Sequence, residues 1–255
     1  MLCKICAVNP FRVENYRQIL ARQRKLHLLK KTYSTSFPEI KDLNTPSFWD
    51  NKLAITKSIQ QEDSMNKDRV KIAYKFLPKA CKRVLDVGAG AGFLEEYLKK
   101  NKYLSIYAND FSDISIKKLK SQFKGNFKKK SIYKMKYPGN FFDCIFILEV
   151  LEHIPPSKTL NILKNINSIL RKKGVLIVSV PMNENLEQIK INLNGHVRDY
   201  NYELIKAELE IAGFNILESR KLYAFRNFYL IKNLLSKILP NRWKPNNVVI
   251  KAVKI

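Results

Sequence analysis

Segments with the pattern of strands alternate with segments with the pattern of helices from residue 83 onward. A buried-strand pattern over 83–88 precedes three closely spaced glycines and a helix over 93–101. A second strand and helix follow at 104–110 and 113–123. Alternation of this kind predicts right-handed βαβ units in a parallel sheet. We therefore expect an α/β fold of the doubly wound, Rossmann-like type.

The rest of the chain continues this pattern and then departs from it. The other expected strands are 127–133, 141–149, 175–181, 215–225 and 247–255, and the other expected helices are 157–174, 201–214 and 227–239. The helix 157–174 is amphipathic and is expected to end at Gly174, and Gly213 closes the helix 201–214. In the tail two strands follow each other at the edge of the sheet, which predicts an antiparallel strand beside the parallel ones.

Residues 1–78 have a different character, and we treat them as a helical, basic extension to a main domain at 79–255. A basic helical pattern covers 13–33, and a segment rich in Pro, Ser and Thr predicts a loop over 34–50. A further helix is expected to stop at Pro78. The extension is a candidate lid. Its adjacent aromatic residues at 48 and 49, Phe48 and Trp49, are expected to pack on the first helix rather than to close over a site.

Composition limits the class of protein. With 255 residues and 45% hydrophobic residues, the chain can bury a globular core. No apolar run reaches the roughly 20 residues of a membrane span, and the start lacks the pattern of a signal peptide. We therefore expect a cytoplasmic protein.

Cys3 and Cys6 form half of a zinc-ribbon ligand set, which is weak evidence for a metal. With Cys81 and Cys144 they do not make a disulfide framework.

The net charge of +25 raises the question of an anionic partner. Basic clusters occur at 22–31, 116–120 and 127–136. They could contact nucleic-acid phosphates or anionic lipid. Charge runs are mostly solvated faces, however, and a lysine-rich composition also follows from AT-rich coding. Charge alone does not decide the partner.

The glycine cluster reads D-x-G-x-G-x-G, with Asp86 followed by Gly88, Gly90 and Gly92. Glycine permits positive φ and a close approach of the backbone to a ligand. A dinucleotide fingerprint reads G-x-G-x-x-G. Phe93 stands where that motif has its third glycine. A close-packed pyrophosphate is therefore disfavoured, although Asp86 could also simply cap the turn.

Three further features accompany this motif: the acidic residue Asp110 at the end of the second strand, and the later strands at 141–149 and 175–181. With them, residues 80–255 resemble the class I S-adenosylmethionine-dependent methyltransferases. The resemblance implies a seven-stranded sheet of order 3-2-1-4-5-7-6 whose last strand is antiparallel. It also implies that S-adenosylmethionine binds against the glycine loop, with Asp110 accepting from the ribose hydroxyls. The residues that it assigns to the cofactor are Asp86, Gly88, Ala89, Gly90, Gly92, Asp110, Phe111, Ser131, Ile132 and Leu148.

Two points about these cofactor residues remain open in the sequence. Asp110 could instead be an Asx-turn residue. Many relatives carry an acidic residue near the adenine, whereas this chain has Ser131 followed by Ile132. The adenine contact is then expected to use the serine hydroxyl, backbone groups and the packing of Ile132.

A second motif, E-x-x-E-H, follows the strand at 141–149 and contains Glu149, Glu152 and His153. Helical spacing predicts that the three side chains share one face. The motif resembles that of the O-methyltransferases of ubiquinone synthesis. Together with His196 it also resembles the four ligands of small-RNA terminal 2′-O-methyltransferases, which implies a Mg²⁺, Mn²⁺ or Zn²⁺ site. Otherwise Glu149, His153 and His196 are candidates for orienting the acceptor or removing its proton, or they merely line a pocket.

The expected function is methyl transfer from S-adenosylmethionine to an oxygen, or a nitrogen, of a small-molecule, lipid-linked or saccharide acceptor. An RNA methyltransferase and an inactive cofactor-binding adaptor are the alternatives, and a nicotinamide dehydrogenase is more distant. The helix 227–239 has apolar and lysine faces that could rest on an anionic membrane. Peripheral membrane contact is therefore expected as a further partner, and the oligomeric state stays open.

Overall fold

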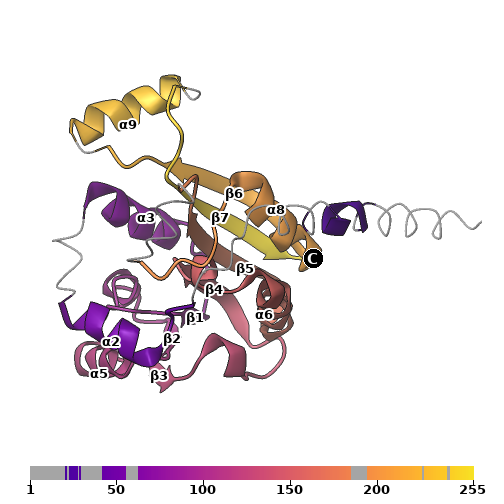
Figure 1. Cartoon of the computed structure of the whole chain (residues 1–255). Helices are drawn as coiled ribbons and strands as arrows, with labels where there is room; N and C mark the ends of the chain where they lie inside the picture. The colour runs from indigo at the N-terminus through magenta and orange to yellow at the C-terminus, as the bar shows by residue number, and fades with distance from the viewer. Residues whose placement is uncertain are drawn as a thin grey trace, which may run out of the picture.

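The computed structural model describes residues 21, 23–27, 29, 42–55, 63–184, 194–225, 227–239 and 242–255. The described strands form one seven-stranded sheet of order β3-β2-β1-β4-β5-β7-β6 (Figure 1). The strands from β3 to β5 are parallel, and β7 is antiparallel to both β5 and β6. This confirms the predicted order and the antiparallel last strand. The Cys3–Cys6 pair and most of the expected helix 13–33 lie outside the described residues.

The strands are β1 Arg83–Val87, β2 Ser105–Asp110, β3 Asn126–Lys129, β4 Phe142–Leu148, β5 Leu170–Pro181, β6 Phe214–Leu222 and β7 Asn247–Lys254. The helices are α2 Pro46–Ile55, α3 Ser64–Lys75, α4 Glu95–Leu98, α5 Asp113–Gln122, α6 Pro156–Ile169, α8 Tyr202–Ile211 and α9 Tyr229–Ile238. Among the described residues no helix has the length and apolar character to cross a membrane.

Alternation along β4 explains why helices cover both faces of the sheet. Ile145 and Ile147 belong to a core built with α6 and α8, whereas Cys144 and Phe146 belong to a second core built with α3, α4 and α5. Successive side chains of a strand point to opposite faces, so a strand covered on both sides must be apolar throughout. The continuous apolar run in the sequence reflects this two-sided burial.

Two predicted boundaries are wrong. The helix expected at 157–174 ends at Ile169, because the chain enters β5 at Leu170, which is fully buried and pairs with Phe142. The basic residues after Ile169 belong to β5 and not to the helix, and Arg171 among them forms an ion pair with Asp143 on β4 at 2.6 Å. The loop expected at 34–50 is helical from Pro46, at the start of α2. Proline suits the first helical position because no backbone donor is needed there.

The order of the strands decides where a ligand can bind. The chain leaves β1 toward β2 on one side and later returns to place β4 on the other side of β1. Helices on opposite faces then leave the carboxyl ends of β1 and β4, which opens a crevice between the loops. Both conspicuous sequence motifs follow these two strands. The fold therefore brings them to one edge of the sheet.

Candidate functional site

A cleft lies at this edge of the sheet. The predicted site residues that line it are Gly88, Gly90, Asp110, Phe111, Ser131, Ile132, Glu149 and His153. The predicted residues outside this lining are Asp86, Ala89, Gly92, Leu148, Glu152 and His196. The structure thus brings both motifs to one cavity.

The glycine loop forms the floor of the cleft after β1. Gly88 has a φ of +75°, and a Cβ there would lie 2.6 Å from Cγ2 of Val150. Gly90 has a φ of +54°, and a Cβ there would point into open space, with Cδ2 of Leu53 the nearest atom at 3.9 Å. A side chain at Gly88 would strike the loop after β4, whereas one at Gly90 would occupy the cleft. Gly92 instead packs close to Phe123 and Leu119 on α5.

Asp110 ends β2 and ties the glycine loop to the start of α5. Its Oδ2 accepts from the Gly90 N–H at 2.9 Å, and its Oδ1 accepts from the Ser112 N–H at 2.9 Å. The second bond is an Asx turn, so the alternative role of Asp110 as an Asx-turn residue is confirmed. This role does not prevent the carboxylate from facing the cleft. Asp110 also lines the cleft, and each carboxylate oxygen retains a further acceptor position for a ligand hydroxyl. Burial raises the pKa of this carboxyl group.

The wall of the cleft that follows β3 carries no acidic side chain among its described residues, Lys130 to Tyr133. It is therefore less polar than an adenine site that contains a carboxylate. Ser131 Oγ accepts from the Tyr133 N–H at 3.4 Å, and the hydroxyl itself keeps a donor. Ile132 and Tyr133 add apolar and aromatic surface beside it. Asn109 fixes this wall, since its Nδ2 donates to the Lys130 carbonyl at 3.2 Å. A flat heteroaromatic ring fits such a wall by packing and by one or two hydrogen bonds.

Asp86 lies beneath the loop rather than in the cleft. It is 3% exposed and neighbours Glu95, whose carboxylate is fully buried. Burial is the main cause that raises the pKa of Asp86 to about 7, and the nearby Asp110 charge raises it further. Burial and the Asp86 charge likewise raise the pKa of Glu95 well above its usual range. The two carboxyl groups therefore retain a proton close to neutral pH.

We expect Asp86 to make the protein less stable as the pH rises from about 4 to about 7. In that window the folded state holds a proton that the unfolded chain has already released, so deprotonation favours unfolding. An Asp86→Asn variant lacks this effect. The difference between its midpoint of thermal unfolding and that of the wild type should shift in favour of the variant as the pH rises through the window. Asp113→Asn, the same change at an exposed carboxylate, is the control, and a constant difference for Asp86→Asn would contradict the assignment.

Helix α2 closes the cleft from the N-terminal side. Trp49 and Leu53 line it, and the Trp49 ring lies edge-on to His153 with centroids 4.7 Å apart. Asp50 anchors the helix to α5 by accepting from the Ser112 hydroxyl and the Ile114 N–H. The prediction that these aromatic residues only pack on the first helix is wrong for Trp49. The sequence could not show which side of α2 the fold would turn toward the cleft.

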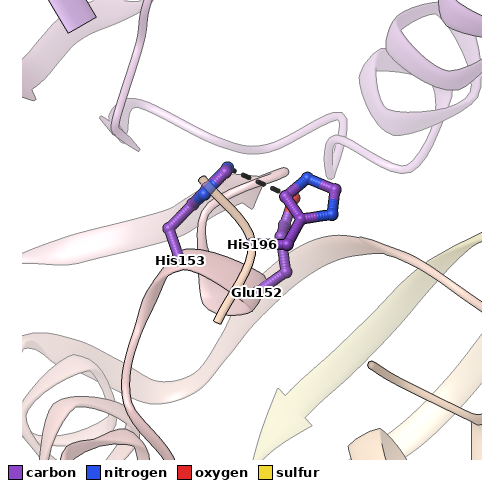
Figure 2. A group of neighbouring side chains, drawn as sticks. All are labelled: Glu152, His153 and His196. Atoms are coloured by element: carbon purple, nitrogen blue, oxygen red, sulfur yellow. Dashed lines mark ion pairs between the residues drawn. The ribbon is translucent and has the colours of Figure 1, made fainter. Parts of the chain in front are cut away.

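Glu152, His153 and His196 meet at the acceptor end of the site (Figure 2). One ligand atom from each lies within 4.8 Å of the others. His153 Nε2 is 3.8 Å from Glu152 Oε1, and the two imidazole centroids are 4.9 Å apart. His196 comes from the distant loop before α8, so the predicted convergence of His153 and His196 is confirmed. Glu152 is fully buried, and neither carboxylate oxygen has a hydrogen-bond partner among the residues that the structure describes.

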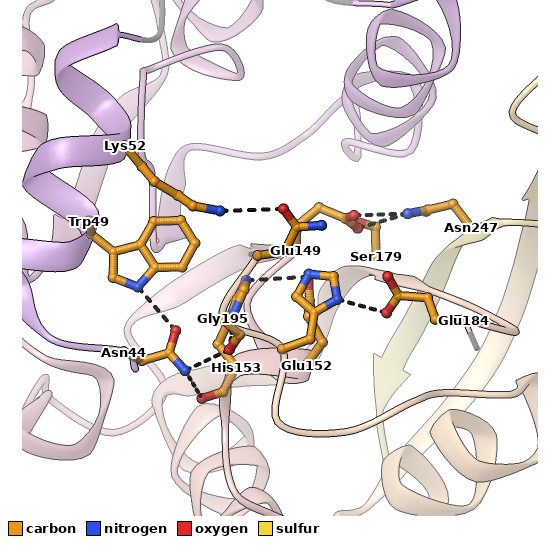
Figure 3. Close-up of polar contacts among 12 residues, drawn as sticks. Asn44, Trp49, Lys52, Glu149, Glu152, His153, Ser179, Glu184, Gly195 and Asn247 are labelled. Carbon is orange, nitrogen blue, oxygen red and sulfur yellow. Dashed lines mark hydrogen bonds and ion pairs between the residues drawn. The ribbon is translucent and has the colours of Figure 1, made fainter. Parts of the chain in front are cut away.

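Each imidazole is oriented through its Nδ1 (Figure 3). His153 Nδ1 is 3.0 Å from the Gly195 carbonyl, which can only accept, so this nitrogen carries the proton. His196 Nδ1 is 2.7 Å from Glu184 Oε2. In both rings the Nδ1 is therefore engaged and the Nε2 faces another direction, the arrangement found when a carbonyl or carboxylate orients a metal-binding histidine. Burial and the neighbouring His196 lower the pKa of His153 to about 3, so its ring is neutral at physiological pH.

The loop that carries His196 is anchored by a buried ion pair. Arg198 donates to Glu208 on α8 through two nitrogens at 2.9 and 3.1 Å, and both residues are fully buried. The Tyr200 hydroxyl donates to the same carboxylate at 2.9 Å. On the other side of the loop, Asn44 Nδ2 donates to the Gly195 carbonyl at 2.8 Å. Rigid anchoring at both ends holds His196 in register with His153.

Glu149 does not join this group, and the prediction that helical spacing places it on one face with Glu152 and His153 is wrong. The segment begins with Glu149 at a φ of +55° and continues as a short 3₁₀ turn, Leu151–His153. The Glu149 carboxylate instead accepts from Ser179 at 2.7 Å and from Asn247 at 2.9 and 3.0 Å (Figure 3). Arg69 lies 3.1 Å from it. Glu149 therefore joins β4, β5, β7 and α3 at the edge of the cleft.

The sheet order and the glycine-floored cleft define the fold of class I S-adenosylmethionine-dependent methyltransferases. A family model described as a methyltransferase domain matches residues 59–219. An uncharacterized protein of Methanocaldococcus jannaschii is 34% identical over 175 residues, which cover 67% of this chain and 72% of that protein. The chain belongs to this methyltransferase-domain family.

Solved structures agree on the fold. The N-methyltransferase NodS of Bradyrhizobium japonicum, determined with S-adenosyl-L-homocysteine, has a TM-score of 0.64 and 14% identity, covering 83% of this chain and 98% of its own. A methyltransferase of Archaeoglobus fulgidus has a TM-score of 0.59 and 22% identity, covering 74% and 92%. At such identities these similarities concern the fold and leave the acceptor open.

Several residues of the cleft carry no signal that marked them in the sequence. Those that line it without having been predicted are Asp42, Asn44, Trp49, Leu53, Val87, Asn109, Lys130, Tyr133, Val150 and Ile154. Most are neighbours of predicted residues, and adjacency to a motif could have found them. The residues from 42 to 53 carry no motif. Trp49 and Leu53 reach the site because α2 packs against α5, and Asn44 reaches it through its bond to the Gly195 carbonyl.

Proposed function

We propose that this chain transfers a methyl group from S-adenosylmethionine to an oxygen of an organic acceptor bound in the cleft beside Trp49 and His153. The observation that carries the proposal is that one cleft runs from Gly90 and Asp110 to His153, beside which His196 lies. A cofactor at the first end and an acceptor at the second would lie end to end. Such alignment is the main requirement of a methyl transfer, because the donor is already activated.

The residues present fit the cofactor. The space above Gly90 is left open by the missing Cβ, and Asp110 offers a carboxylate to a ribose diol. When bound, S-adenosylmethionine supplies an electrophilic methyl group on a sulfonium. This chain's residues supply its position: the glycine loop supports the chain of the molecule, and Asp110 sets its rotation. Trp49 and Leu53 keep water from the cleft, so α2 is the part of the N-terminal extension that acts as a lid.

At the acceptor end we assign Glu152, His153 and His196 to a divalent cation. A buried carboxylate without a hydrogen-bond partner costs free energy unless a positive charge is close. Among the described residues Glu152 is such a group, and two imidazoles oriented through their Nδ1 atoms lie beside it. Two imidazoles and one carboxylate suit Zn²⁺, Mn²⁺ or Fe²⁺ better than Mg²⁺. A bound cation would act as a Lewis acid that lowers the pKa of an acceptor hydroxyl.

Transfer of a labelled methyl group tests the proposed function. The purified chain is incubated with methyl-labelled S-adenosylmethionine and with lipid, soluble small-molecule or RNA fractions from the source cells. We expect label in the lipid or small-molecule fraction, and about tenfold less label at subsaturating S-adenosylmethionine when Asp110→Ala replaces the wild type. Label confined to RNA would overturn the acceptor class. Absence of both cofactor binding and label transfer would overturn the methyltransferase function.

A further inference from the structure

Helix α9 presents its apolar side to solvent. It lies between β6 and β7 in sequence and projects beyond the end of the sheet (Figure 1). Leu230, Leu234 and Ile238 are 80%, 60% and 67% exposed, and Ile231 and Phe228 are 61% and 74% exposed. The spacing of these residues places them on one side of the helix. An amphipathic helix of a globular protein ordinarily buries that side.

The opposite side of α9 faces the rest of the protein with polar groups. The Tyr229 hydroxyl donates to Asp68 on α3 at 2.7 Å. Ser236 is 4% exposed, and its hydroxyl donates to the Asn233 carbonyl. The bond to α3 is therefore made from the polar side of the helix, and the apolar side is left outward. An external apolar phase would bury this side, which the described part of the protein leaves exposed.

Aromatic and basic side chains border the apolar side. The Phe225 ring stacks on Tyr223 and lies edge-on to Trp243, with centroids 5.5 Å apart in both cases. Lys232 lies over the Phe225 ring and Arg242 over the Trp243 ring. Arg242 and Lys244 are exposed. Amphipathic aromatic rings beside cations are typical of the boundary between lipid headgroups and acyl chains.

The positive charge of residues 220–255 distinguishes between the possible partners of α9. From Arg220 to Ile255 the sequence has nine Lys and Arg residues and no Asp or Glu. A second copy of the chain would bring the same positive charge against it. A nucleic acid would match the charge but leave the aliphatic side chains in water. An anionic lipid surface satisfies both the charge and the apolar face.

We propose that residues 223–225, 227–239 and 242–246 form a peripheral membrane anchor, which lays α9 on an anionic phospholipid bilayer with Leu230, Leu234 and Ile238 in the acyl boundary. Helices of this kind lie about 5–10 Å into the interface. The anchor is separate from the cleft and does not depend on the proposed function. A membrane-docked enzyme of this design would meet a lipid-linked acceptor at the bilayer surface.

Vesicle co-sedimentation of the full chain tests the anchor. We expect binding to vesicles of equal parts phosphatidylglycerol and phosphatidylcholine, and weak binding to phosphatidylcholine alone. Leu230→Gln with Leu234→Gln should weaken binding by about tenfold for each leucine. Arg242→Gln with Lys244→Gln should weaken it by about fivefold for each charge. Tyr103→Gln, at a residue that is 93% exposed elsewhere on the surface, is the control and should bind as the wild type does.

The leucine variant changes exposed positions only, so its thermal unfolding and its affinity for S-adenosylmethionine should match those of the wild type. These controls separate a failed anchor from a failed methyltransferase. Failure of the wild type to bind anionic vesicles would overturn the proposal, as would equal binding by the leucine variant. A wild-type dimer in light scattering that the leucine substitutions convert to a monomer would overturn it in favour of a second copy.

Discussion

Replacing Gly90 by valine is expected to abolish S-adenosylmethionine binding while the protein remains folded. At a φ of +54°, a side chain costs about 1–2 kcal/mol, and more when it is β-branched. The larger effect is steric. The Cβ would point into open cleft space rather than into protein, so the branched side chain would occupy the volume meant for the cofactor. Isothermal titration calorimetry measures the loss.

Gly139→Val is the matched control for this variant. Gly139 is exposed, and a Cβ there would meet only the Ser168 carbonyl at 3.6 Å. It should therefore bind the cofactor normally. Asp110→Ala should also weaken binding, because losing a charged hydrogen bond costs about 1.5–3 kcal/mol, or tenfold or more. Wild-type affinity in Gly90→Val and Asp110→Ala would mean that the cofactor binds elsewhere.

Loss of the Glu152–His153–His196 group is expected to reduce methyl transfer without weakening cofactor binding. Positioned acid–base or Lewis-acid groups contribute about 10²–10⁴-fold to rates. His196→Ala and Glu152→Gln should therefore lower kcat by that order while leaving the dissociation constant of S-adenosylmethionine unchanged. His27→Ala, at the exposed third histidine, should change neither quantity. The label-transfer assay and calorimetry together provide both numbers.

Metal removal distinguishes the roles left open for these residues. If the group holds a cation, EDTA should abolish turnover, added Mn²⁺ or Zn²⁺ should restore it, and elemental analysis should find metal in the wild type but not in His196→Ala. The last measurement does not depend on activity. EDTA-resistant turnover that still falls in His153→Ala would assign His153 to proton removal instead. Full activity in both histidine variants would exclude the group from catalysis.

The sequence by itself determined the sheet and the cofactor end of the site. Periodicity marked the strands, and the motif from Asp86 to Gly92 with Asp110 marked the floor of the cleft. These features can be recognised in the sequence because their causes are local: a positive φ favours glycine, and a strand covered on both faces is mostly apolar. The carboxyl ends of neighbouring parallel strands then meet at one edge, whatever the loops between them contain.

The tertiary structure alone decided which neighbours in sequence act together. Glu149 and Glu152 share one motif, yet a left-handed residue followed by a 3₁₀ turn sends Glu149 to Arg69 and Asn247, and Glu152 to the two histidines. Trp49 carries no motif and reaches the cleft because Asp50 is bound to the start of α5. The outward apolar side of α9 follows from the bond between Tyr229 and Asp68. Each of these outcomes depends on partners distant in sequence, and short-range patterns contain no information about which distant groups will meet.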